Sequence, residues 1–130
     1  MPSVTTTSES GFASESEIRE FAWDIDPSGE DAPDTLEALI AAYAACFVPA
    51  LRVGAEQRNV GELGRVEIDA TGDLNDDDKL AAIAFDIKVA ADVNQEDAER
   101  AVDRAEDLCK VHDAVKQQLK ASMSITPNAF

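Results

Sequence analysis

The stretch "TLEALIAAYAACFVPALRV", residues 35–53, decides the fold. Its large apolar side chains recur at spacings of three and four residues, with alanines between them, which is typical of an α-helix. Glu37 and Arg52 are its only charged residues. A helix this apolar has to be covered by protein on nearly every side, and one chain of 130 residues has few elements to cover it. We therefore expect a long buried central helix and a second copy of the chain against it.

Segments on both sides of this helix alternate apolar and polar residues, as half-buried strands do. The segment "IREFAWDID", residues 18–26, predicts a strand in which Arg19 points toward the buried side. The segments "GRVEIDATG" (64–72) and "AIAFDIKVA" (82–90) predict two antiparallel strands. The acidic turn between those strands lacks the Gly and the Glu of a calcium-binding loop, so we expect no calcium there.

A second helix is expected after Asn94, whose side chain can cap it. Its apolar stripe ends at Cys109, which should therefore face the core. The segment "SMSIT", residues 122–126, predicts a last strand. Residues 1–11 are polar and are expected to form a disordered tail, which leaves residues 12–130 as a single α+β domain.

The charge balance excludes several classes of partner. The chain has 27 Asp and Glu against 11 Lys and Arg, a formal net charge of −16. Such a surface repels nucleic acid and anionic membranes, so we expect neither as a partner. The N-terminus has no secretory signal pattern and no uninterrupted apolar run reaches membrane-spanning length, so a cytoplasmic protein is expected. The acidic, lysine-poor composition resembles the proteins of halophilic microbes.

Two cysteines lie 63 positions apart, Cys46 and Cys109, and both are predicted on inward helix faces. A buried cysteine is most simply a small apolar side chain, but in a reducing compartment a pair can also form a transient catalytic disulfide. His112 follows Cys109 by about one turn; it either deprotonates that thiol or is a solvated helix residue. These three residues lack an obvious fourth ligand, so no metal site is expected.

Two of these segments resemble the OsmC (osmotically inducible protein C) and Ohr (organic hydroperoxide resistance) family. "TLEALIAAYAACF", residues 35–47, is similar to the family's central helix, which carries the reactive cysteine. "CKVHDA", residues 109–114, stands where the family has Cys-Pro-x-Ser-Asn-Ala. The order of strands and helices is also similar, over about residues 12–126. Lys110 and His112 depart from the family's Pro and Ser.

The resemblance implies an OsmC-like fold, an intertwined homodimer and a thiol-dependent peroxidase active in oxidative stress. Cys46 would be the peroxidatic thiol and Cys109 the resolving one, with an organic hydroperoxide as the substrate. An external dithiol would be the reductant, and no cofactor is implied. Because Leu36 stands at the position of the family's catalytic Glu, a non-catalytic dimeric ligand-binding or stress-associated protein is the alternative.

The resemblance also implies a catalytic Arg and Glu. A free thiol is mostly protonated at neutral pH, so a nearby cation is needed to hold the thiolate. Arg19 matches the family's Arg in chain order, and Arg52 is its competitor. Glu37 lies next to the position of the family's Glu, but nine helical residues at ~1.5 Å each separate it from Cys46 by about 13 Å. Glu37 would therefore act only from a partner subunit.

A halophilic protein should gain stability in salt. We expect the melting temperature to rise between low and multimolar KCl, because salt screens the repulsion among the surface carboxylates. Thermal unfolding followed by circular dichroism at increasing KCl concentrations measures this. A melting temperature that is flat or falls across the series contradicts the halophilic hypothesis.

Overall fold

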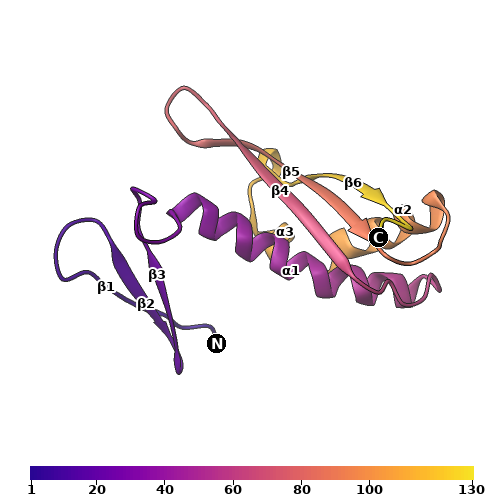
Figure 1. Cartoon of the computed structure of the whole chain (residues 1–130), viewed down its shortest axis with the longest axis horizontal. Coiled ribbons are helices and arrows are strands. Elements are labelled where there is room, and N and C mark those ends of the chain that lie inside the picture. The colour runs from indigo at the N-terminus through magenta and orange to yellow at the C-terminus, as the bar shows by residue number, and fades with distance from the viewer. The chain divides into compact units, whose positions relative to one another are not determined.

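The computed structural model describes all 130 residues and divides into two compact units, Met1–Leu39 and Ile40–Phe130 (Figure 1). The boundary lies inside the long helix α1, Thr35–Gln57, and not in a loop. This explains why no linker was visible in the sequence.

The first unit is built on a three-stranded antiparallel sheet in the order β1-β2-β3. Its strands are β1 (Thr5–Thr7), β2 (Ser14–Ile18) and β3 (Phe21–Ile25). The expectation of an unstructured tail over residues 1–11 is therefore wrong at β1. Threonine favours extended backbone, and β2 supplies the pairing partner that a sequence pattern does not reveal.

The predicted strand over residues 18–26 is partly wrong. It begins at Phe21, because Arg19 and Glu20 form the turn between β2 and β3. Arg19 has a φ of 57°, which lies in the left-handed region and ends the extended conformation. Its side chain is exposed, not directed inward, and its guanidinium lies 5.1 Å from the centre of the Phe21 ring.

The second unit contains a sheet in the order β4-β5-β6. Strands β4 (Val66–Leu74) and β5 (Leu80–Val89) are antiparallel, as predicted. Strand β6 (Ser122–Thr126) also lies where it was predicted, and it pairs parallel to β5. Along β5 the buried residues alternate with exposed ones, so only one face of the sheet is covered.

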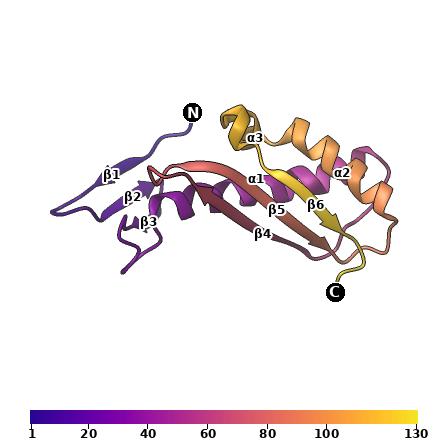
Figure 2. The same ribbon diagram turned by 90° about the horizontal axis from the view of Figure 1, so that it is seen from above.

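Helices cover that face (Figures 1 and 2). The predicted central helix is confirmed as α1, and the predicted second helix as α2 (Gln95–Leu108). The amide of Asp97 donates to the side chain of Asn94, which is the expected cap. Two short helices follow, α3 (Lys110–Ala114) and the 3₁₀ helix η1 (Gln117–Leu119).

Helix α1 packs into the core of the second unit through one of its faces. Tyr43 and Phe47 are fully buried and contact the ring of Phe85 on β5, with ring centroids 4.6 and 5.7 Å away. Near its end, α1 approaches α2 closely: a Cβ on Gly54 would lie 2.9 Å from the carbonyl oxygen of Ala101. Glycine is therefore the residue that this helix crossing requires.

The other face of α1 is not covered within the second unit. Val53 is 43% exposed, and the small residues one and two turns before it are exposed as well. By length and composition alone α1 is apolar enough to cross a membrane, but the helix supplies much of the core of the second unit. The face of α1 that packs on the sheet is buried as expected, and cover of the other face by a second copy stays a prediction.

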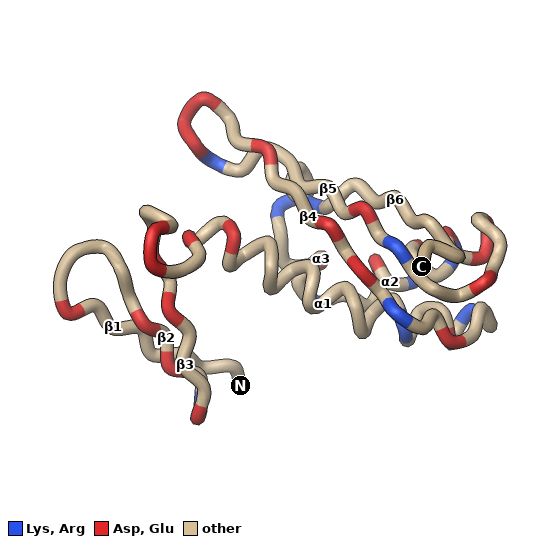
Figure 3. Tube along the Cα trace, viewed as in Figure 1, with Lys and Arg blue, Asp and Glu red and all other residues tan.

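The acidic residues lie mostly at exposed positions in turns, on strands and on helix α2. Figure 3 shows a run of carboxylates in the loop between β4 and β5, with one lysine beside them. This loop contains Asp76, Asp77 and Asp78, followed by Lys79, and all four are exposed. The negative charge is thus carried by solvated residues, which matches a globular protein with an acidic surface.

Candidate two-thiol site

The two cysteines meet where α1 passes the junction of α2 and α3. Cys46 lies on α1, half-buried, and Cys109 is 1% exposed. Both are free thiols, and each shifts the pKa of the other. The prediction that Cys109 faces the core is confirmed, and packing brings the two sulfurs together across the sequence separation.

Cys109 is not part of a helix, contrary to the stripe predicted for it. It ends α2 and caps α3, with extended backbone at φ −73° and ψ 115°. This break turns the chain so that its side chain accepts a hydrogen bond from the amide of His112, with 3.4 Å between nitrogen and sulfur. The apolar stripe could not reveal the break, because a capping residue and a helical one can occupy the same face.

The surroundings of the two thiols shift their pKa values in opposite directions. Burial would raise the pKa of Cys46, but the backbone N–H groups of Val111 and Lys110, the Cys109 thiol and the Lys110 charge together lower it. Burial raises the pKa of Cys109, and the neighbouring Cys46 raises it further. Because the two thiols interact, the pair loses its first proton at a lower pH than an isolated thiol would, and its second proton at a higher pH. The first thiolate is therefore held mainly on Cys46.

Lys110 is the cation that sequence reasoning missed. It stands at the Pro position of the family's second cysteine motif, where the sequence shows only a difference from that motif. In the structure its charge acts on Cys46, although its own side chain is exposed. Its position directly after Cys109 was the only sign in the sequence of a cation near the thiols. The packing of α1 beside this turn is what puts Lys110 near Cys46.

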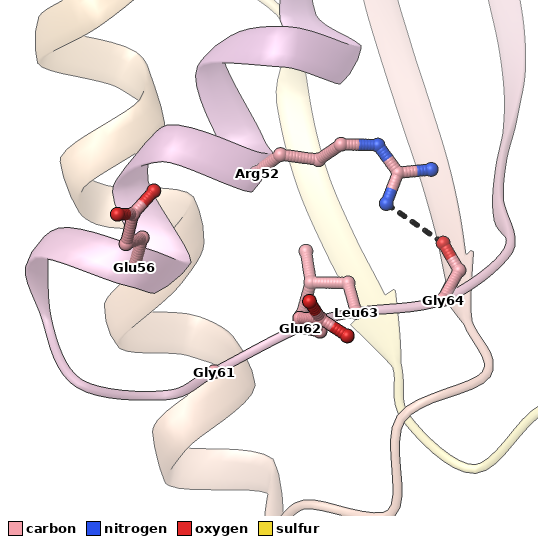
Figure 4. Close-up of a pocket in the computed structure, with 6 residues that line it drawn as sticks. All are labelled: Arg52, Glu56, Gly61, Glu62, Leu63 and Gly64. Atoms are coloured by element: carbon pink, nitrogen blue, oxygen red, sulfur yellow. Dashed lines mark hydrogen bonds between the residues drawn. The ribbon is translucent and has the colours of Figure 1, made fainter.

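Within its own chain Arg52 is engaged away from Cys46. Its guanidinium donates to the carbonyl oxygen of Gly64 at 2.8 Å, as the close-up in Figure 4 shows. It lines a separate pocket of about 560 Å³ near the end of α1, together with Glu56, Glu62 and Leu63. No interaction of Arg52 contributes to the pKa shift of Cys46.

Arg19 and Glu37 both belong to the first unit, and their catalytic roles stay predictions. Glu37 is engaged locally in a capping box: its carboxylate accepts from the amide of Asp34 at 2.9 Å. In return, its own amide donates to the Asp34 carboxylate at 2.8 Å. This reciprocal pair makes Asp34 the cap at the start of α1.

His112 has neither of the two roles expected for it. It is only 7% exposed, so it is not a solvated residue. Its ring nitrogens face Tyr43 and Glu106, and only its backbone amide reaches Cys109, so the ring is not placed to deprotonate that thiol. Sequence reasoning missed Tyr43 and Glu106 as its partners, since both had the pattern of ordinary helix positions.

The histidine and the thiols do not combine into a metal centre. No group of three or more His, Cys, Asp or Glu side chains in the chain is arranged to hold a metal ion. The chemistry available at this site is that of two coupled thiols, a set of backbone N–H donors and one lysine.

We expect the two thiols to titrate in separate steps. Cys109→Ala should raise the pKa of Cys46, because it removes a hydrogen bond that favours the thiolate. Lys110→Gln should raise the Cys46 pKa less, because the Lys110 charge affects this thiol less than the hydrogen bonds do and its side chain is exposed. Ultraviolet absorbance of the thiolate against pH measures both variants. An unchanged Cys46 pKa in Cys109→Ala would mean that the two sulfurs do not interact.

Comparison with known proteins shows which family the chain matches. Residues 28–124 match the family model described as OsmC-like protein. An uncharacterized protein of Haloferax volcanii is 41% identical over 127 residues, covering 98% of this chain and 96% of the relative.

Solved structures share the fold. The OsmC-like protein of Mycoplasma pneumoniae is 16% identical with a TM-score of 0.86, over 98% of this chain and 96% of that one. The organic hydroperoxide resistance protein OhrB of Bacillus subtilis is 20% identical with a TM-score of 0.74, over 97% and 98%. The resemblance drawn from the two cysteine segments is thereby confirmed, and the chain belongs to the OsmC-like protein family.

Proposed function

We propose that this protein is a thiol-dependent peroxidase that reduces organic hydroperoxides through Cys46 and Cys109. The observation that carries the proposal is the pairing of two thiols with opposite pKa shifts, one half-exposed and the other buried. A peroxidatic cysteine has to be an accessible thiolate, whereas a resolving cysteine has to stay close and unreacted until the first is oxidised. Cys46 and Cys109 have these respective properties.

The reaction needs three balanced steps. The Cys46 thiolate attacks the outer oxygen of the hydroperoxide, the O–O bond breaks, and the alkoxide leaves and takes up a proton to form the alcohol. The Cys109 sulfur then attacks the Cys46 sulfenic acid, which forms the disulfide and releases water. An external dithiol reduces this disulfide by thiol exchange and becomes a disulfide itself.

Cationic groups would stabilise both the thiolate and the leaving alkoxide. Lys110 already acts on Cys46 in the second unit. The family resemblance adds Arg19 for the alkoxide and Glu37 for orienting the peroxide, each contributed at the subunit interface of a dimer. The resemblance supports these two roles by chain order alone.

The surroundings of Cys46 favour an organic substrate over hydrogen peroxide. Cys46 packs against the core cluster on its inner side, and the apolar residues Ala42, Ala45 and Pro49 lie exposed beside it on α1. Apolar walls gain free energy by covering the organic part of a hydroperoxide, which hydrogen peroxide lacks. The similarity in fold to a protein named for organic hydroperoxide resistance supports the same class.

One equivalent of cumene hydroperoxide tests the proposal. We expect the reduced protein to lose both thiols and to form a Cys46–Cys109 disulfide, detected by thiol counting and peptide mass spectrometry. Cys46→Ser should lose none, and Cys109→Ser should stop at a sulfenic acid on Cys46. Hydrogen peroxide at the same concentration is the matched control and should react more slowly.

A non-catalytic, ligand-binding OsmC-like protein is the second candidate. Leu36 at the family's Glu position favours it, as does the engagement of Glu37 in the capping box with Asp34. In that case cumene hydroperoxide leaves both thiols free in the wild-type protein. The same thiol count therefore decides between the two functions.

We also propose that the protein is a homodimer. The uncovered face of α1 presents exposed small and apolar residues at helical spacing: Ala41, Ala42, Ala45, Pro49 and Val53. A stripe of this kind lets two helices approach closely, and burying it against a second copy removes apolar surface from water. The central position of α1 in the resembling family supports the same arrangement.

A charge on this face should prevent association. We expect Ala42→Glu to shift the protein toward the monomer mass, because a carboxylate would be buried opposite an apolar partner. Gln118→Glu, on the exposed helix η1, adds the same charge elsewhere and should leave the mass unchanged. Size-exclusion chromatography with light scattering measures both. A wild-type protein that runs as a monomer contradicts the dimer.

A further inference from the structure

Buried hydrogen bonds beside the two-thiol site join α1, α3 and the residue before β6, and a contact of His112 with Glu106 reaches α2. The amide of Ala121 donates to the Tyr43 hydroxyl oxygen at 2.9 Å, and this hydroxyl also bonds to Nδ1 of His112. On the other side of the ring, Nε2 of His112 lies 3.5 Å from Oε2 of Glu106. Tyr43, His112 and Glu106 come from α1, α3 and α2 respectively.

The direction of each bond follows from what the groups can donate. The Tyr43 oxygen already accepts from Ala121, so its buried hydrogen needs an acceptor, and Nδ1 of His112 is the one in reach. His112 then has to be neutral with its proton on Nε2, facing the Glu106 carboxylate. A protonated ring has two N–H donors and no acceptor, so it cannot receive the Tyr43 hydrogen.

Two further bonds tie His112 to the chain around the thiols. Its amide donates to the Cys109 sulfur, and its carbonyl oxygen accepts from Nζ of Lys120 at 2.7 Å. His112 is therefore the residue through which α1 fixes the turn that begins at Cys109. The same turn provides the Lys110 and Val111 amides that favour the Cys46 thiolate.

We propose that His112 is a positioning residue of the two-thiol site: its neutral ring, held between Tyr43 and Glu106, fixes the Cys109 turn, and protonation of the ring loosens it. The positioning itself depends only on these contacts. Its consequence for turnover rests on the proposed peroxidase function.

The titratable groups around the ring favour the neutral form. Burial lowers the pKa of His112 below its ordinary value of 6.5, and Lys120 lowers it further, while Asp113 opposes them. Burial also raises the pKa of Glu106, with Asp103 and Asp107 adding to the effect and Lys120 opposing it. An ion pair between His112 and Glu106 would shift both pKa values the other way, so the contact is one of a neutral imidazole. The remaining neighbours, Tyr43 and Cys109, are both protonated acids with raised pKa values.

The direction in which stability changes with pH follows from the lowered pKa of His112. The folded protein binds a proton at His112 less readily than the unfolded chain does, so protonation favours unfolding. The stabilisation is complete above the ordinary histidine pKa and is lost as the pH falls through the lower pKa of the folded protein. The turn should therefore loosen only at mildly acidic pH.

The single histidine of the chain makes its protonation directly observable. Nuclear magnetic resonance of the protein with isotope-labelled histidine should give one set of ring signals. We expect these signals to show the Nε2–H tautomer at neutral pH and a pKa below 6.5. Tyr43→Phe should raise that pKa, because it removes the donor that requires a neutral Nδ1. An Nδ1–H tautomer, or a pKa at or above the ordinary value, overturns the proposal.

Diamide oxidises the two thiols to a disulfide without any peroxide, so the rate of this reaction tests whether His112 positions the Cys109 turn. His112→Asn is the matched variant, because its amide oxygen can accept the Tyr43 hydrogen but does not titrate. We expect the ratio of the wild-type rate to the variant rate of Cys46–Cys109 disulfide formation to hold one value at neutral pH, whatever that value is. Below the His112 pKa, this ratio should fall by about two- to tenfold, the factor that one net hydrogen bond represents. A rate ratio that is constant with pH overturns the proposal.

The two proposals can fail separately. A pH-dependent diamide ratio with no reaction toward cumene hydroperoxide would leave His112 as a positioning residue in a non-catalytic protein. Reaction with cumene hydroperoxide and a constant diamide ratio would leave a peroxidase whose turn does not depend on His112. Thermal unfolding of each variant identifies any general loss of stability.

Discussion

The contact between α1 and the turn at Cys109 is the constraint on which the rest of the site depends. A thiolate inside a protein loses hydration, and burial alone would keep Cys46 protonated. The turn offsets this with backbone N–H groups, a second thiol and a lysine, all within the same few residues. A helix that packed one turn further along would place Cys46 against apolar side chains only, and the thiol would be an ordinary core residue.

The site also shows how a strongly acidic protein can stabilise the Cys46 thiolate. The net charge of −16 opposes a further negative charge, but most of the carboxylates are exposed, where salt and water screen them. The donors around Cys46 act at contact distance in a partly buried environment, where screening is weaker. Short-range hydrogen bonds therefore outweigh the long-range repulsion.

Much of the fold could be read from the sequence, because hydrophobic periodicity reports which face of an element is buried. It located α1, α2, β4, β5 and β6, and the cap at Asn94 fixed where α2 begins. It failed at Arg19, where a left-handed residue interrupts an alternating pattern, and at Cys109, where a cap interrupts a helical one. In both places a single backbone conformation, and not the distribution of apolar residues, decides the structure.

The sequence by itself determined that two cysteines lie on inward faces of a small α+β protein, and its similarity to OsmC-like proteins indicated which segments carry them. Only the tertiary structure decided that the sulfurs meet, that Lys110 is the nearby cation and that Arg52 is engaged elsewhere. It also decided that His112 is buried between Tyr43 and Glu106. The physical reason is that periodicity records burial, whereas pKa values and hydrogen-bond partners depend on atoms that are distant in the chain and adjacent only after packing.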